Sequence, residues 1–92
     1  MIIRILGEGQ RELADRHEPE LNGLDDALAA AVTAGDEAAY QQTLTALLER
    51  VRALGSPLPD DALTASDAIL PGEGSSLAEV RALLGEQGLI PG

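Results

Sequence analysis

Few residues of this chain have the types and spacing that catalysis or ligand binding requires. Gly7-Glu8-Gly9 resembles part of a phosphate-binding loop, but Glu12 stands where a dinucleotide-binding fingerprint has glycine, and no helix opens directly after it. We therefore interpret Gly7-Glu8-Gly9 as a hairpin turn. His17 is the only histidine, and no cysteine or serine motif accompanies it, so we expect a surface histidine.

Three pairs of adjacent carboxylates are the remaining candidates for metal or acid–base chemistry: Asp25-Asp26, Asp36-Glu37 and Asp60-Asp61. Neighbouring helical residues point about 100° apart, so the first pair does not share a face. The second pair suits the start of a helix. The third lacks the alternating carboxylates of a calcium loop. The sequence therefore predicts no catalytic, cofactor-binding or metal-binding residue, and it indicates that the protein is not an enzyme.

The charge balance limits the classes of partner. The 92 residues hold 16 carboxylates and six arginines, giving a formal net charge of −10. Such a surface opposes binding to nucleic acid and to anionic lipid headgroups, but it permits a basic protein partner. Cysteine is absent, no signal-peptide pattern is present, and no apolar run approaches the roughly 20 residues that span a bilayer. We expect one cytoplasmic domain over residues 1–92.

Two helices are predicted between Pro19 and Leu54, where apolar residues recur at spacings of three and four. The first set is Leu21, Leu24, Leu28, Ala31 and Val32, and the second is Tyr40, Leu44, Leu47, Leu48, Val51 and Leu54. Gly35 suits the end of the first helix and Asp36 the start of the second, so the pair forms an antiparallel hairpin. Leu28, Leu44 and Leu48 are predicted to be buried. Asp25 is assigned to the polar side, where Asp25→Ala would cost under about 0.5 kcal/mol.

Short strands are expected on both sides of this hairpin. Residues 2–6 form an apolar run that indicates a strand covered on both faces, and residues 10–13 form a returning strand. Two prolines predict an extended loop over residues 56–61, and residues 68–70 form a third strand that pairs with the first. Ser76 and Glu79 have the spacing of a capping box for a last helix, which ends at Gly85 or Gly88 and whose apolar face holds Leu77, Val80, Leu83 and Leu84. The result is an α+β domain of order β-β-α-α-β-α, with a sheet of two or three strands on a helical hairpin.

An ordered set of segments along the whole chain resembles the PspA-associated protein family, PspAA. The segments are Met1-Ile2-Ile3-Arg4-Ile5, Gly7-Glu8-Gly9-Gln10, Leu24-Asp25-Asp26-Ala27-Leu28, Ala34-Gly35-Asp36-Glu37, Pro57-Leu58-Pro59-Asp60-Asp61, Ser66-Asp67, Ile69-Leu70-Pro71, Glu79-Val80-Arg81 and Gly88-Leu89-Ile90-Pro91-Gly92. The family's members are small actinobacterial and archaeal proteins linked with PspA, a coiled-coil phage-shock protein that supports stressed membranes. The resemblance implies a non-enzymatic accessory role in the envelope-stress response, exerted through a PspA-like helical partner at the membrane. It carries over no catalytic residue.

Two alternatives stay open at this level. The acidic surface also permits a regulatory module that binds a basic transcription regulator, whereas an enzyme is a distant third. The apolar first strand predicts a homodimer formed through the sheet, because 92 residues hold little to cover a second face. A monomer whose tail, Leu89-Ile90-Pro91, covers that face is the alternative.

Overall fold

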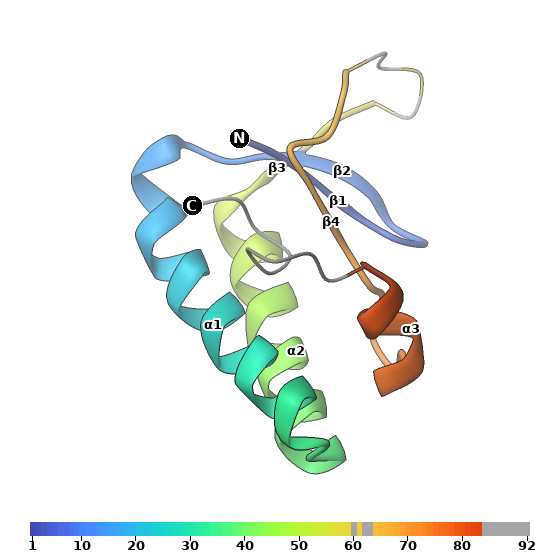
Figure 1. The fold of residues 1–92 in the computed structure, drawn as a ribbon. Coiled ribbons are helices and arrows are strands. Elements are labelled where there is room, and N and C mark those ends of the chain that lie inside the picture. Colours follow the sequence, from blue (N-terminus) through green and yellow to red (C-terminus); the bar gives the residue numbers. More distant parts are fainter. Residues whose placement is uncertain (60, 62–63, 84–92) are drawn as a thin grey trace.

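A computed structural model describes residues 1–59, 61 and 64–83 of the chain. The elements follow in the order β1 (Ile2–Ile5), β2 (Gly9–Glu12), a 3₁₀ turn η1 (Asp15–His17), α1 (Glu18–Ala34), α2 (Glu37–Leu54), β3 (Ser56–Pro57), β4 (Ala68–Leu70) and α3 (Leu77–Leu83). In Figure 1 the two long helices run side by side and the strands gather at one end of them. The predicted α+β order β-β-α-α-β-α is confirmed, with a further two-residue strand between α2 and β4.

The helical hairpin is confirmed in detail at its turn. Gly35 ends α1 in the left-handed conformation with φ of 68°, a value that glycine adopts without strain. Asp36 caps the start of α2, and its side chain accepts a hydrogen bond of 3.0 Å from the backbone N–H of Ala39. Leu28, Leu44 and Leu48 are fully buried, as predicted.

Asp25 corrects the predicted orientation of α1. It is only 2% exposed, whereas Leu24 beside it is half-buried. The buried stripe runs through Leu21, Asp25 and Leu28, which are spaced by four and three and therefore share one face. The charge of Asp25 favours the solvent side in the sequence, and that assignment is wrong. Removing a buried carboxylate is expected to cost more than the roughly 0.5 kcal/mol of a surface change.

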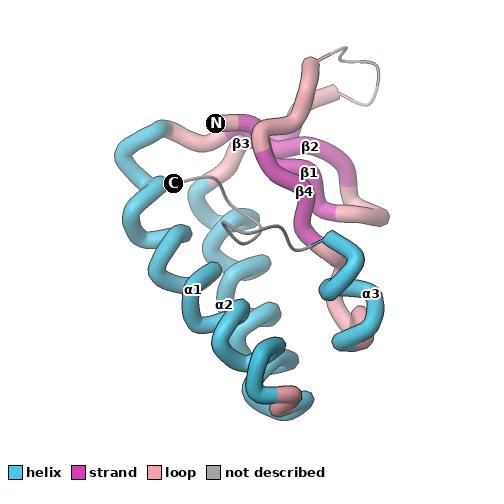
Figure 2. Tube along the Cα trace, viewed as in Figure 1, coloured by secondary structure: helices cyan, strands magenta, loops and turns pink. Residues whose placement is uncertain are grey.

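The sheet has four strands in the order β3-β2-β1-β4, one more than the upper limit predicted. Strands β1 and β2 are antiparallel, and β4 pairs with β1 in parallel, placing Ile3 beside Ala68 and Ile5 beside Leu70. The extra strand β3 lies in the stretch expected to be a loop. It pairs with β2 at the edge of the sheet, where a proline is tolerated because its missing N–H breaks no inner ladder. Figure 2 shows the strands as one group beside the helices.

The two faces of the sheet differ in cover. Ile3 and Ile5 point into the core that the sheet shares with α1 and α2, and both are fully buried. Along β1, the other face holds Arg4, with Leu6 just beyond the strand, and Leu6 is 45% exposed. Ile69 of β4, which pairs with Arg4, is 42% exposed. The prediction that the first strand is covered on both faces is therefore wrong over this part of the outer face.

A segment after β3 covers the rest of that outer face. Gln10 of β2 is only 6% exposed, and its side-chain amide donates to the backbone oxygen of Thr64 at 2.6 Å and to Ser66 Oγ at 2.8 Å. Asp67 Oδ2 accepts from the backbone N–H of Ile2 at 2.7 Å. These bonds fix residues 64–67 over the sheet and leave Arg4, Leu6 and Ile69 uncovered.

The last helix, α3, is held against the far part of the hairpin. The Gln41 amide donates to the backbone oxygen of Ser75 at 2.9 Å, and Arg81 donates to that of Val32 at 3.3 Å. Ser76 Oγ accepts from the backbone N–H of Glu79 at 3.2 Å, which confirms one half of the capping box. Val80 is buried, as predicted. The Leu83 side chain, Leu84, the predicted stops at Gly85 or Gly88 and the apolar tail lie outside the described residues.

Candidate functional site

Gly7-Glu8-Gly9 forms the turn between β1 and β2, as predicted. Gly7 and Gly9 have φ of 87° and 104°, a backbone region that side chains disfavour, and the N–H of Glu8 donates to the Ile5 oxygen at 2.9 Å. A glycine-rich turn between antiparallel strands places no helix N-terminus behind it, so it lacks the geometry of a phosphate-binding loop. The hairpin interpretation is confirmed.

The carboxylate of Glu8 belongs to the largest ionic cluster in the described part of the chain. Arg52 of α2 engages both of its oxygens, with Nε to Oε1 at 3.0 Å, and reaches Glu73 Oε1 at 3.1 Å through Nη1. Arg11 stands 4.0 Å from Glu8. The hydrogen bonds from Arg52 lower the pKa of Glu8, and the same bonds raise the pKa of Arg52. Because the cluster joins the β1–β2 turn, α2 and the loop before α3, it acts as a clamp between elements.

The other residues singled out in the sequence are dispersed. His17 is half-buried at the end of η1, just before α1. Asp25 and Asp26 are on different faces, one buried and one exposed, as their spacing predicts. Asp36 is the cap of α2. Asp61 is exposed, while Asp60 lies outside the described residues.

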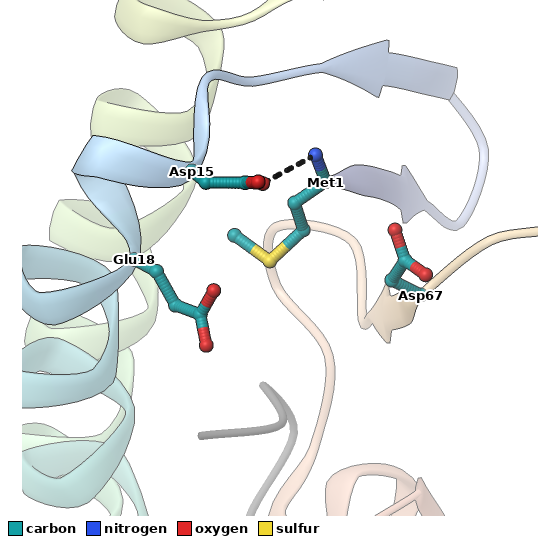
Figure 3. Close-up of a pocket in the computed structure, with 4 residues that line it drawn as sticks. All are labelled: Met1, Asp15, Glu18 and Asp67. Carbon is teal, nitrogen blue, oxygen red and sulfur yellow. Dashed lines mark hydrogen bonds and ion pairs between the residues drawn. The ribbon is translucent and has the colours of Figure 1, made fainter.

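One pocket gathers three carboxylates around the first residue. It has a volume of about 340 Å³ and is lined by Met1, Asp15, Glu18 and Asp67 (Figure 3). Met1 lies between Asp15 and Asp67, and its amino group donates to the Leu13 oxygen at 2.9 Å and to Asp15 Oδ1 at 3.2 Å. Asp67 already accepts from Ile2. Within residues 1–59, 61 and 64–83, no group of three or more histidine, cysteine or carboxylate side chains is arranged to hold a metal ion.

A second hollow lies on the helical hairpin. It is an open groove of about 460 Å³ between α1 and α2, near the end of the hairpin that joins the sheet. Glu20, Gly23 and Leu24 line it from α1, and Ala46, Glu49 and Arg50 line it from α2. We call these six residues the hairpin groove. Its floor is apolar because Gly23 has no side chain, Ala46 has a short one and Leu24 is only half-buried.

The rim of the hairpin groove is charged. Arg50 donates to Glu20 through Nε at 2.7 Å and Nη2 at 3.2 Å, which lowers the pKa of Glu20 and satisfies both side chains. Glu49 is exposed and makes no ion pair with any described residue. An apolar floor with a charged rim is the usual anatomy of a surface that binds another protein.

Fold and surface together define a small α+β protein with an apolar, charge-rimmed hollow on its helical hairpin. The family model of the PspA-associated proteins, PspAA, matches residues 1–92, so the chain belongs to this family. The resemblance noted in the sequence is thereby confirmed over the whole chain. No curated protein and no solved structure matches the chain. Over the described ranges, no helix combines the length and apolar character needed to cross a membrane.

Sequence reasoning missed the hairpin groove, the burial of Asp25 and the clamp formed by Arg52. One feature of the sequence indicated the groove, because Gly23 interrupts a helix made largely of leucine and alanine. A glycine at that position is equally well explained as a residue that lowers the stability of the helix. No such feature indicated the clamp, because its members are separated by 44 and 21 positions along the chain. Contacts of that range depend on how the elements pack.

Proposed function

We propose that this protein is a non-enzymatic accessory protein of the phage-shock response that binds a PspA-like helical partner. The observation that carries the proposal is the match of the PspA-associated family model to residues 1–92. The hairpin supports it, because residues 18–54 hold seven carboxylates against two arginines, a formal net charge of −5. An acidic, groove-bearing hairpin suits a basic helical partner.

We further propose a cytoplasmic location, with the membrane reached only through the partner because an acidic surface repels anionic lipid headgroups. With a formal net charge of −10, the protein alone is expected not to bind anionic vesicles or nucleic acid at about 0.15 M salt. Any membrane localisation in cells should then disappear when the PspA-like protein is deleted.

Direct titration of the purified protein with the PspA-like protein of the same cell tests the proposal. Calorimetry should give a saturable complex that weakens as salt is added, because acidic and basic surfaces attract each other. A basic transcription regulator from the same cell is the comparison, since an acidic regulatory module is the alternative function. Saturable binding of that regulator with none of the PspA-like protein would contradict the proposal.

The exposed outer face of the sheet supports a homodimer as a second association. Leu6 and Ile69 are the large apolar side chains that stay exposed in the described part of the chain, and β4 is an edge strand. An edge strand offers unpaired backbone groups to a neighbouring strand. This surface is separate from the hairpin groove, so the two associations do not exclude each other.

A further inference from the structure

The hairpin groove has space that the chain itself does not fill. A Cβ atom placed on Gly23 would meet nothing within 4 Å, so the missing side chain leaves open room above the floor. Leu24 of α1 and Ala46 of α2 are the other two apolar residues of that floor. A side chain from another molecule can therefore lie against Gly23 without meeting atoms of this chain.

The charges around the hairpin groove determine which kind of binding partner is electrostatically favoured. Glu20 is neutralised by Arg50, which leaves Glu49 as the uncompensated charge on the rim. The surrounding hairpin is acidic as well. A second copy of this chain would bring another surface of the same sign, and like charges facing each other are disfavoured. The groove is therefore complementary to a segment with apolar side chains flanked by lysine or arginine.

We infer that the hairpin groove binds one amphipathic helix of the partner, with large apolar side chains on the face toward Gly23 and basic side chains on both flanks. The helix would lie against α1 and α2 as a third helix, in the helix-in-groove mode of recognition. This inference rests on the proposed function, and it adds the surface used and the chemistry of the segment recognised.

The matched pair Gly23→Arg and Thr33→Arg tests the groove. Both variants add one positive charge to α1, but Thr33 is exposed about 80° around the helix on the side away from Leu24. Arginine is a good helix former and Gly23 has open space above it, so Gly23→Arg should fold. Circular dichroism and thermal unfolding of both variants provide the folding control.

The probe is a synthetic amphipathic peptide of leucine and lysine at helical spacing, and a leucine–glutamate peptide of the same pattern is its control. The wild-type protein should bind the basic peptide and not the acidic one. Gly23→Arg should weaken that binding by about tenfold or more, and Thr33→Arg by less than about twofold. Absence of binding to the wild-type protein, or equal affinity of the two folded variants, would overturn the inference.

A charge-reversal pair provides a second route if Gly23→Arg does not fold. Glu49→Arg should weaken binding of the basic peptide more than Glu12→Arg, because Glu12 is exposed on the sheet. Equal losses of peptide affinity in Glu49→Arg and Glu12→Arg would show that only the net charge of the protein matters. The hairpin groove would then not be the binding site. The same variants titrated with the PspA-like protein separate the two claims: if all of them bind it as the wild type does, the proposed function stands and the groove is wrong.

Discussion

Tyr40 is the only aromatic residue of the chain, and it lies in an unusual position for a phenol. The side chain is fully buried in the core, and its hydroxyl has no hydrogen-bond partner among the described residues. Burial, with Glu37 and Glu79 nearby, raises the pKa of the hydroxyl. A buried polar group without a partner destabilises a fold by about 1–3 kcal/mol, so the ring stabilises the core despite its hydroxyl.

Tyr40→Phe should therefore leave the protein as stable as the wild type, or more stable by up to about 2 kcal/mol, in urea unfolding at neutral pH. Because the pKa of Tyr40 is raised in the folded protein, the free energy of unfolding should also depend on pH. The unfolded tyrosine releases its proton near pH 10 and the folded one only at higher pH, so wild-type stability should fall as the pH rises above 10. The Phe variant should lack this fall. A loss of more than about 1 kcal/mol in Tyr40→Phe would mean that the hydroxyl has a partner.

The Arg52 clamp predicts a pH dependence of the opposite sign. Arg52 lowers the pKa of Glu8 below its ordinary value of 4.5, so the stabilisation is complete above that value and is lost as the pH falls through the folded pKa. Arg52→Gln should cost about 1 kcal/mol near neutral pH, since the pair is partly exposed, and the difference should shrink in acid.

The control for this prediction is Arg16→Gln, which removes the same charge from an exposed residue with no ion pair in the described structure. Carbon-detected NMR titration should show the pKa of Glu8 moving up toward 4.5 in Arg52→Gln and staying unchanged in Arg16→Gln. An unchanged pKa of Glu8 in both variants would show that Arg52 does not hold the Glu8 carboxylate in solution.

At the scale of the elements, two glycines in or next to the hairpin are predicted to respond oppositely to alanine. Gly23 lies inside α1 with open space around it, so Gly23→Ala should stabilise the protein by about 1 kcal/mol through helix propensity. Gly55 ends α2 with an ordinary φ of −92°, but a Cβ there would lie 2.8 Å from the Val51 oxygen and 3.0 Å from Arg11 Cβ.

Gly55→Ala should therefore destabilise the protein by about 1–3 kcal/mol through crowding. Urea unfolding of both variants measures the two effects under the same conditions. Stabilisation by both substitutions would show that the junction of α2, β2 and β3 is looser than the contacts at Gly55 indicate.

Most of the elements were predictable because they carry a local signal in the sequence. The spacing of leucines defines both helices, Gly35 and Asp36 mark their turn, and residues 68–70 form the strand β4 at the predicted positions. Asp25 was misplaced because helical periodicity assigns faces by polarity, and a buried carboxylate breaks that rule. The strand β3 was not predicted because two residues show no strand pattern in the sequence. Ser56 and Pro57 become a strand only by pairing with β2.

At the scale of the whole molecule, self-association through the sheet is a prediction that the structure refines. A charge on β1 tests it only on the exposed face, because Ile3→Glu would place the charge in the core, where Ile3 is fully buried. Leu6→Glu is the suitable change. Light scattering at micromolar concentration should give about twice 9.5 kDa for the wild type and 9.5 kDa for Leu6→Glu, with unchanged circular dichroism. A wild-type mass of 9.5 kDa would rule the dimer out.

The candidate site was less predictable than the fold. Composition alone, with 16 carboxylates and six arginines, permits a basic partner but does not locate a binding surface. The groove needed the pairing of α1 with α2, which brings Gly23 opposite Ala46 across 23 positions of sequence. Neither residue has chemistry of its own, so no motif could have revealed them.

An NMR titration of the isotope-labelled protein with the PspA-like protein of the same cell would show directly which surface binds. Backbone amide signals of Gly23, Leu24, Ala46 and Glu49 should shift or broaden first, while those of Arg4 and Ile69 on the sheet should stay unchanged. Shifts confined to the sheet, or no shift at saturating partner, would show that the hairpin groove does not bind the PspA-like protein.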